Sequence, residues 1–297
     1  MSTPTPDRTD RVAVVIPAYN HARYVAEAVA SAAAQGDCVA EIVVVDDGSS
    51  DATAAVVRGI AEPRLRLITQ TNSGPSAARN RGWRSTSSPW IFFLDADDTL
   101  APDALPALLS AVVPGGVPEI PYGFQEVYAD DFRGAPHFTA DLARVSGDLL
   151  AAIASGYGAT IFVGLFPRTA IEAIGGFDEA VHHGEDFDIA LRLALRNRFR
   201  RVEQPVYRAR MHGTNRHRDF AATACLDYAR TVERVFRGST RPRELWVRQA
   251  GLAYRWMQYG CHLRDAGDRA GARRAFRTAW LHFPPRLGNL RAWILCR

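Results

Sequence analysis

The sequence predicts an α/β fold in which a doubly wound, mostly parallel sheet carries helices on both faces, followed by an α-helical C-terminal subdomain. Three segments, "VAVVIP" (12–17), "EIVVVD" (41–46) and "WIFFLD" (90–95), are continuous apolar runs, which is typical of strands covered on both faces. Alanine-rich segments separate them, and short connections between strand and helix favour right-handed crossovers. With 297 residues, 47% of them hydrophobic, the chain can bury a full core.

The elements of the first half follow in order. A weaker strand is expected at "RLRLIT" (64–69). The predicted helices cover residues 21–35, 51–61 and 75–86, and "SSDAT" supplies a capping signal for the second of them. The pattern is therefore β-α-β-α-β-α-β. A further helix is expected at about 102–112, followed by irregular sequence to about residue 158.

The second half predicts a strand, a short helix, a glycine-rich loop and a longer helix from about residue 185. The segment "FRRVEQPVYRARMHG" (199–213) looks like a strand pair that closes the domain. From about residue 217 the sequence is helical, with one segment similar to a tetratricopeptide-type hairpin. We therefore expect a lead at 1–10, a main domain at 11–215 and a helical subdomain at 216–297.

All 36 basic residues are arginine, which excludes Schiff-base chemistry and a lysine-bearing phosphate loop. From Ile189 onward there are 24 Arg against 7 Asp plus Glu. Such a region suits an anionic acceptor or an anionic membrane surface, or is simply a solvated helical face. No motif that reads nucleic acid accompanies it, so no nucleic acid is expected.

The expected localisation follows from features that the sequence lacks. There is no apolar run of membrane-spanning length, no signal-peptide core at the N-terminus and no disulfide framework among the four cysteines. We expect a cytoplasmic protein. Peripheral association with the inner face of the membrane is a further hypothesis, because the last segment, "RLGNLRAWILCR" (286–297), has an interfacial composition. Packing of that segment on the helical subdomain is the alternative.

Polar residues follow the predicted parallel strands at a common edge of the sheet, where ligands of such folds bind. They are "PAYN" (17–20), "DDGS" (46–49) and "DAD" (95–97). The glycine fingerprint of dinucleotide-binding folds is missing after the first strand, which disfavours a nicotinamide or flavin enzyme. Three carboxylates within four positions, directly after a buried strand, predict a bound cation.

The motifs "VVIPAYN", "EIVVVDDGSSDAT", "NSGPSAARNRG", "FLDADD", "GGFDE" and "GEDFD" occur in this order. Together they resemble the family 2 glycosyltransferases, inverting enzymes with the GT-A fold, over residues 11–215. The resemblance implies a GT-A-like sheet and a nucleotide-sugar donor, for which a UDP-sugar is the first expectation and dTDP- or GDP-sugars are alternatives. The acceptor is left open among a glycan, a lipid-linked saccharide, a peptide and a small natural product.

The resemblance also assigns roles to residues of this chain. Asp95 and Asp97 match the family's D-x-D motif and, with His212, would hold Mn²⁺ or Mg²⁺ and through it the donor diphosphate. Arg208 and Arg210 would add positive charge there, and Asp98 would order the turn. The expected nucleotide-binding residues are Pro17, Tyr19, Asn20, Asp46, Asp47, Arg79 and Asp95.

For catalysis, the resemblance implies that Asp186, with Glu185 beside it, is the base that deprotonates the acceptor. Both lie where a helix is expected to begin, and the helix dipole favours negative charge there. Asp188 is expected on the helix surface, and His182 and His183 could line the acceptor pocket. The residues expected near the sugar and acceptor are Gly175, Gly176, Phe177 and Asp178.

Two alternative functional interpretations of the sequence remain open. A haloacid-dehalogenase-type phosphatase would use the similar D-x-D-x-T string in "LDADDTL", but three β-α units precede it here and no lysine exists to support it. A non-catalytic glycosyltransferase-like scaffold is the second alternative. The C-terminal helices are also a candidate homodimer interface.

Overall fold

The computed structural model describes residues 11–113, 119–129, 132, 134–140, 146–157, 163–181, 183–212 and 221–283. Its contacts divide the chain into two units. The first comprises Met1–Gly147, Thr160–His182 and Arg196–His212, and the second comprises Asp148–Ala159, His183–Leu195 and Gly213–Arg297. We describe each unit by itself.

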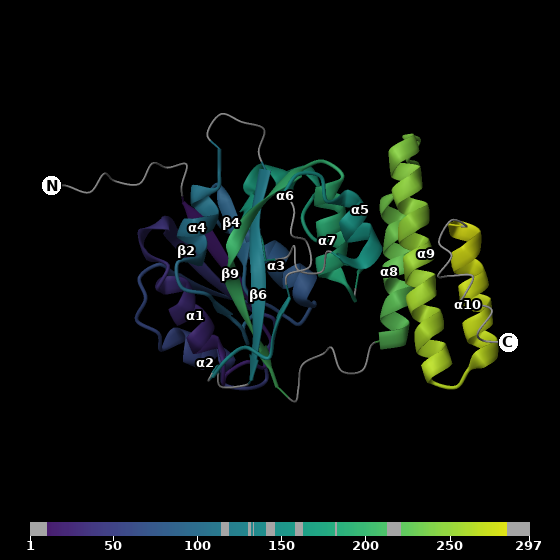
Figure 1. Ribbon diagram of the computed structural model, residues 1–297. Coiled ribbons are helices and arrows are strands. Elements are labelled where there is room, and N and C mark those ends of the chain that lie inside the picture. Colours follow the sequence, from purple (N-terminus) through teal and green to yellow (C-terminus); the bar gives the residue numbers. More distant parts are fainter. Residues whose placement is uncertain are drawn as a thin grey trace. The chain divides into compact units, whose positions relative to one another are not determined.

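The first unit contains a five-stranded sheet (Figure 1) in the order β3-β2-β1-β4-β8. The first four strands are parallel and β8 is antiparallel to β4. This confirms the mostly parallel sheet that the apolar runs predict, and the strand bounds lie within two residues of those expected at the ends that bear the polar motifs. The strands are β1 (Val12–Ala18), β2 (Val39–Asp46), β3 (Leu65–Thr69), β4 (Trp90–Phe93) and β8 (Phe166–Pro167).

Helices cover both faces of this sheet because successive strand residues point to opposite sides. Ile42 and Val44 of β2 pack with residues of α1 in the larger core cluster. Val43 and Val45 pack instead with Ala78 of α3. The helices of this unit are α1 (Val25–Ala33), α2 (Thr53–Arg58), α3 (Pro75–Arg84), α4 (Ala104–Ser110) and α6 (Arg168–Ala173), with a 3₁₀ turn at Gly36–Cys38.

A second sheet of four strands has the order β5-β9-β6-β7. Its strands are β5 (Thr99–Leu100), β6 (Glu119–Ala129), β7 (Phe138–Ala140) and β9 (Arg198–Met211). Two expectations are wrong here. The region before residue 158 is not irregular, since β6 runs through it, and the expected strand pair at 199–213 is one long strand. Pro205 lies where the register of β6 and β9 shifts, so the strand accommodates this proline at a bulge and continues instead of turning back.

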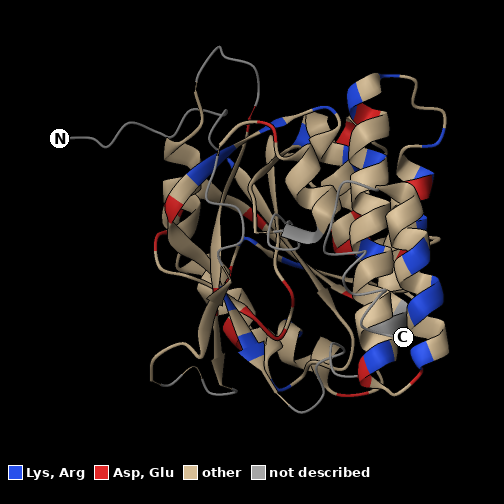
Figure 2. Ribbon diagram, turned by 45° about the vertical axis from the view of Figure 1, so that its right-hand side comes forward, with Lys and Arg blue, Asp and Glu red and all other residues tan. Residues whose placement is uncertain are grey.

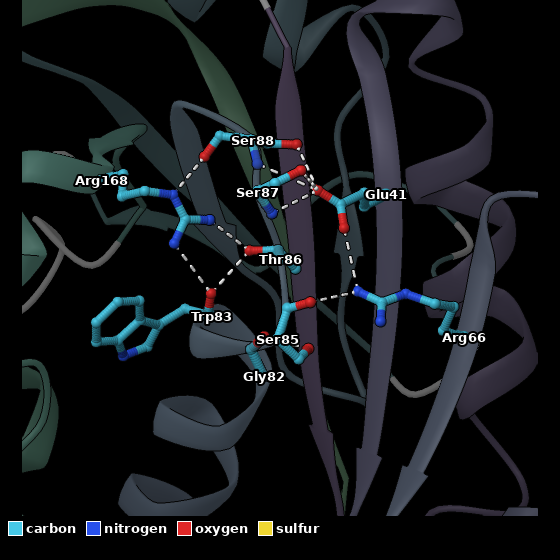
Figure 3. Close-up of polar contacts among 9 residues, drawn as sticks. All are labelled: Glu41, Arg66, Gly82, Trp83, Ser85, Thr86, Ser87, Ser88 and Arg168. Carbon is cyan, nitrogen blue, oxygen red and sulfur yellow. Dashed lines mark hydrogen bonds and ion pairs between the residues drawn. The ribbon is translucent and has the colours of Figure 1, made fainter.

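A polar cluster fastens the segment after α3 to the sheet (Figure 3). The Glu41 carboxylate accepts hydrogen bonds from the backbone N–H groups of Ser87 and Ser88, at 2.9 and 3.1 Å, and lies 3.1 Å from the Arg66 guanidinium. Arg168 donates to the Ser88 carbonyl and the Thr86 hydroxyl. The cluster thus fixes the chain immediately before β4, the strand that leads to the acidic motif.

The second unit is helical. It contains α5 (Leu150–Ala152), a π-helical turn (Ile153–Tyr157), α7 (Glu185–Ala194), α8 (Ala221–Val235), α9 (Pro242–Asp265) and α10 (Arg269–His282). Basic residues recur along its long helices, where the ribbon is coloured blue (Figure 2). The predicted hairpin is present as α9 and α10, and Gly260 lets them approach closely, because a Cβ there would lie 2.5 Å from the Phe276 ring.

The division at residue 215 that the sequence suggests differs from this grouping. Helix α7 belongs with the C-terminal helices because the Phe187 ring packs 5.0 Å from that of Tyr228 on α8. Asp188 of α7 also pairs with Arg234 of α8. Short-range sequence patterns carry no signal for such contacts.

No helix within the described ranges is long and apolar enough to cross a membrane. Among the described residues, Cys38 is a half-buried cysteine that forms no disulfide.

Candidate active site

The carboxyl ends of β1 and β2 bring the first two polar motifs together. Pro17 pairs with Val45 and Ala18 with Asp46 in the parallel register. Tyr19 follows with 42% of its surface exposed, so the residue is accessible to a ligand. Parallel pairing is the reason that motifs from distant segments share one edge.

Asn20 joins these two loops. Its Oδ1 atom accepts hydrogen bonds from the backbone N–H of Ser50, at 2.8 Å, and of Asp51, at 3.3 Å. Its own N–H donates to the Ser49 hydroxyl at 2.9 Å, and its φ of 59° is in the left-handed region that asparagine tolerates. Asn20 thus shapes the site through backbone contacts.

The two aspartates after β2 are both buried but differ in their partners. Asp46 accepts a hydrogen bond at Oδ1 from the Ser49 N–H, and its Oδ2 has no hydrogen-bond partner among the described residues. Asp47 accepts three, from Gln70 Nε2 and from the backbone N–H groups of Ser73 and Gly74, at 2.7 to 2.9 Å. Asp46 therefore keeps an oxygen for a ligand, whereas the carboxylate of Asp47 holds the loop before α3.

Arg79 of α3 lies beside the acidic motif. Its guanidinium pairs with Asp95 Oδ1 at 2.7 Å and lies 5.5 Å from the centre of the Phe177 ring. The arginine side chain is buried, but 38% of the Asp95 side chain is exposed. The pair joins two of the predicted nucleotide-binding residues, and Asp95 keeps an accessible face.

The acidic motif meets the end of β9. The Nε2 atom of His212 lies 3.0 Å from Oδ2 of Asp97, and the imidazole stacks on the Tyr24 ring at 5.0 Å. Pairing of β5 with β9 brings these segments together, with Thr99 opposite Arg208 and Leu100 opposite Tyr207. His212 and Asp97 are thus adjacent.

Arg210 supports the same turn. Its backbone N–H donates to Asp98 Oδ1 at 2.7 Å, and its Nε donates to the carbonyl oxygen of Asp97 at 2.8 Å. Its guanidinium pairs with Glu27 at 2.6 Å. Arg210 therefore orders the acidic turn, and part of its charge is already neutralised. Arg208 lies 4.0 Å from Glu126 instead.

Asp98 is the innermost of the three carboxyls. Burial, and then the charges of Asp97 and Asp95, raise its pKa well above its usual range, against the hydrogen bonds from Arg210 and Tyr207. The same burial and the charges of Asp95 and Asp98 raise the pKa of Tyr207 well above its usual range. The ionised form of Asp98 is therefore disfavoured, and a cation at the turn would offset the charges that disfavour it.

The glycine loop is anchored by a residue that the sequence did not single out. Asn80 Oδ1 accepts the Phe177 N–H at 2.9 Å, and Asn80 Nδ2 donates to the Phe177 carbonyl. Gly176 has a φ of 81°, and a Cβ there would lie 2.5 Å from Asn80 Oδ1. Gly175 is exposed, and the Asp178 carboxylate accepts the Ala180 N–H within its own turn. The sequence did offer one sign of this role. Asn80 is a polar residue between Arg79 and Arg81, at a position on the buried face of α3.

Glu185 and Asp186 form the first turn of α7 in the second unit, after Gly184 in the left-handed region. Asp186 Oδ1 accepts the Phe187 N–H at 2.8 Å. The expectation that Asp188 lies on the helix surface is wrong, because its side chain is 1% exposed and pairs with Arg192 and Arg234. His183 is exposed, and His182 lies outside the described residues.

The donor set at the acidic turn fits Mn²⁺ or Mg²⁺. Carboxylate oxygens suit both ions, and an imidazole nitrogen is compatible with manganese. In the part of the chain that the structure describes, no group of three or more acidic, histidine or cysteine side chains is arranged to enclose a metal by itself. Asp97 and His212, whose side chains lie 3.0 Å apart, could therefore supply only part of a coordination shell.

Residues 13–152 match the family model described as "Glycosyl transferase family 2". This match, which spans somewhat less than half of the chain, makes the chain similar to the family 2 glycosyltransferases. Succinoglycan biosynthesis protein ExoO of Rhizobium meliloti is 36% identical over 63% of this chain and 56% of its own length. Chondroitin synthase of Escherichia coli is 28% identical over 70% of this chain and 30% of its length. The chain thus spans between about a third and somewhat over half of these two relatives.

Solved structures agree in fold. Residues 1–349 of S. aureus TarS in complex with UDP superpose with a TM-score of 0.63 at 16% identity, over 96% of this chain and 90% of that one. The mannosyltransferase PcManGT of Pyrobaculum calidifontis, in complex with GDP-Man and Mn²⁺, has a TM-score of 0.58 at 20% identity, over 98% and 87%. The GT-A-like fold class, with a helical C-terminal region, is confirmed.

Proposed function

We propose that this protein is a metal-dependent, inverting glycosyltransferase that transfers a sugar from a nucleoside diphosphate sugar, a UDP-sugar first, to a hydroxyl or amide of an acceptor. The observation that carries the proposal is the Asp97–His212 pair at 3.0 Å beside Asp95. Asp97 lies in the acidic motif, within residues 13–152 that match the family, and His212 directly follows β9, outside the matched residues. The acceptor classes to test are a saccharide, a lipid-linked saccharide, a peptide and a small natural product.

The first unit supplies the donor site. The exposed Tyr19 ring would pack on the base, and the free Oδ2 of Asp46 would accept a hydrogen bond from a base N–H. Arg79 holds Asp95 in place, and Asp95, Asp97 and His212 would hold the metal with the diphosphate. When bound, the metal supplies Lewis-acid stabilisation of the negative charge that grows on the departing nucleoside diphosphate.

Asp186 of α7 is the proposed base. The Asp186 carboxylate would take the proton from the acceptor as its oxygen or nitrogen attacks the anomeric carbon. The bond between that carbon and the diphosphate oxygen breaks with its electron pair leaving on the diphosphate. Attack from the side opposite to the leaving group inverts the configuration at the sugar. Glu185, one position earlier on α7, would position the acceptor.

Similar proteins support the donor class and the metal. S. aureus TarS is solved with UDP and with UDP-GlcNAc, and PcManGT with GDP-Man and Mn²⁺. Asp46 would accept a hydrogen bond from any base that offers an N–H, so it does not discriminate among nucleotides. The choice of UDP therefore rests on the comparison with TarS.

The first experiment is thermal stabilisation by UDP, GDP, dTDP and CDP, each with and without Mn²⁺. We expect one nucleotide, UDP, to raise the melting temperature only when the metal is present, and Asp97→Ala to abolish the shift. Asp103→Ala, at an exposed aspartate after the same motif, is the matched control and should keep it. The absence of any nucleotide response, together with magnesium-dependent release of phosphate from simple esters, would contradict the proposal in favour of the phosphatase.

The two alternatives are not favoured. The family match extends over residues 13–152 and includes the first two strands and their motifs, which a phosphatase would leave unexplained. A scaffold would have no need for a buried arrangement around Asp95 and Asp97. Association with an anionic membrane and homodimerisation stay predictions of the sequence, and the segment 286–297 lies outside the described residues.

A further inference from the structure

One buried cation of the second unit has no counter-ion among the residues that the structure describes. Arg255 of α9 is 8% exposed, and its Nε is enclosed with no hydrogen-bond partner. No carboxylate or carbonyl oxygen of the described residues lies within hydrogen-bond or ion-pair distance of its guanidinium. Since a buried charge without a partner costs folding free energy, such an arginine calls for either compensation or a ligand.

Aromatic rings provide part of the compensation. The Arg255 guanidinium carbon lies 4.5 Å from the centre of the Phe187 ring, 4.6 Å from that of Tyr228 and 5.4 Å from that of Tyr254. These rings come from α7, α8 and α9, and each attracts the cation. They satisfy none of its five N–H donors, because ring faces accept a cation without replacing an oxyanion acceptor.

The cage of rings is attached to the start of α7. Phe187 directly follows Asp186 in sequence, and the Tyr228 ring lies so close to Gly184 that a Cβ there would meet it at 2.3 Å. Gly184 directly precedes the Glu185-Asp186 pair. The guanidinium is therefore held beside the turn that carries the proposed base, and all of these residues belong to the second unit.

The electrostatic surroundings agree with this placement. Burial lowers the pKa of Arg255, while Tyr228, Tyr254, Cys225 and Asp186 act to raise it. Burial, then the charge of Asp186, raises the pKa of Tyr228 to about 12, so that its hydroxyl stays protonated and can donate at neutral pH. Asp186 is the one carboxylic acid among these four neighbours of Arg255.

We propose that Arg255 binds an oxyanion, a carboxylate or phosphate group of the acceptor, next to the proposed base. The planar guanidinium offers two parallel N–H donors, which match the two oxygens of such a group. Binding would pair the buried charge and place the acceptor by a group other than the one that reacts. The inference rests on the proposed function for the role of Asp186, and it adds that the acceptor is anionic.

The test titrates the full-length protein with inorganic phosphate and with methyl glucuronide at constant ionic strength, using calorimetry. Methyl glucoside, which lacks the charge, is the ligand control. Arg264→Gln, at an exposed arginine of the same helix that pairs with Asp265, is the variant control. We expect saturable binding of phosphate or the glucuronide to the wild type and to Arg264→Gln, and binding at least about tenfold weaker in Arg255→Gln. Comparison of the two ligands shows which oxyanion the site prefers.

Equal oxyanion affinity in Arg255→Gln and the wild type, or no saturable binding to the wild type, would overturn the inference, since Arg255 would then be a structural cation. Loss of the UDP response in Arg255→Gln with oxyanion binding unchanged would also overturn it. The UDP titration tests the proposed function separately. If the proposed function is wrong, UDP will give no response in the wild type or in either variant, while oxyanion binding persists.

A measurement on the wild type covers the case in which Arg255→Gln does not fold. Phenylglyoxal modifies arginine side chains, and peptide mass spectrometry reports the rate at each position. We expect phosphate or methyl glucuronide to slow the modification of Arg255 and to leave Arg264 unchanged. Equal rates at Arg255 with and without both ligands would contradict the proposal.

Discussion

His212 and Asp97 are separated by 115 residues in the chain, yet Nε2 of the histidine lies 3.0 Å from Oδ2 of the aspartate. The pairing of the short strand β5 with β9 produces this contact, since β5 begins two residues after Asp97 and β9 ends immediately before His212. The Tyr24 ring stacks on the imidazole and fixes its plane. An oxygen and a nitrogen donor are thus presented together before any ligand arrives.

Replacing His212 with alanine should weaken metal binding, because one of the three proposed ligands is lost. We expect an apparent affinity for Mn²⁺ lower by about 10–100-fold in the presence of UDP, measured by titrating the metal against the melting temperature. His137→Ala, at an exposed histidine of the same unit, should behave as the wild type. Unchanged manganese dependence in His212→Ala would remove this residue from the metal site.

Replacing Asp186 with asparagine should abolish turnover and leave donor binding intact, since the amide cannot accept the acceptor's proton. We expect kcat to fall by about 10²–10⁴-fold, measured as release of the nucleoside diphosphate in the presence of acceptor, with the metal-dependent UDP shift retained. Asp265→Asn, at an exposed position of α9, is the control. Activity near that of the wild type would assign the base to another residue.

Replacing Asp188 with asparagine should destabilise the second unit, because Arg192 and Arg234 would lose a shared, buried carboxylate. We expect a loss of about 2–4 kcal/mol in the free energy of unfolding, measured by urea denaturation. Asp227→Asn removes a more exposed partner of Arg230 and should cost less than about 1 kcal/mol. Equal effects of the two substitutions would show that burial of Asp188 contributes nothing.

Glu41 should make the stability depend on pH. Partial burial raises its pKa, but the hydrogen bonds from Ser87 and Ser88 and the charge of Arg66 outweigh this, so that the pKa lies below its usual 4.5 in the folded protein. The contribution of the carboxylate is therefore fully present above pH 4.5 and is lost as the pH falls through the lower, folded-state pKa. Glu41→Gln should cost about 1–2 kcal/mol at pH 7.

The measurement for Glu41 is chemical denaturation of both proteins from pH 7 down to the acid limit of folding. The difference in unfolding free energy should shrink only below pH 4.5. Glu172→Gln, at an exposed glutamate of α6, is the control and should show no such trend. A difference that stays constant down to the acid limit would show that the charge of Glu41 is not what stabilises the cluster.

Much of the first unit could be predicted because its signals are local. Runs such as "EIVVVD" are buried on both faces, and β2 occupies that segment with its ends displaced by no more than two residues. The helix over 75–86 was expected for the same reason, and α3 is there. By contrast, β6 and the single long β9 were missed, because their pairing is between segments some 80 residues apart and their sequences are mixed in polarity.

The candidate site residues were likewise predictable only where their sequence signal is local. Asp95 and Asp97 were evident from three carboxylates after an apolar run, and Asp186 from its place in a familiar motif. Asn80 was missed because its role depends on meeting the backbone of Phe177, 97 positions away. The error over Asp188 has a similar origin, since an acidic residue in a first helical turn gives no local sign that α8 will cover it.

The sequence by itself determined the succession of strands and helices along the first part of the chain, the edge at which the polar motifs gather and the family resemblance, because apolar periodicity and motif spacing act along the chain. Only the tertiary structure decided which side chains meet there. It paired His212 with Asp97 and enclosed Arg255 in aromatic rings beside the start of α7. It also directed the side chains of Asp47 and Asn20 into hydrogen bonds with loop backbone. These contacts depend on the packing of segments distant in sequence, which fixes burial and charge partners that no local pattern contains.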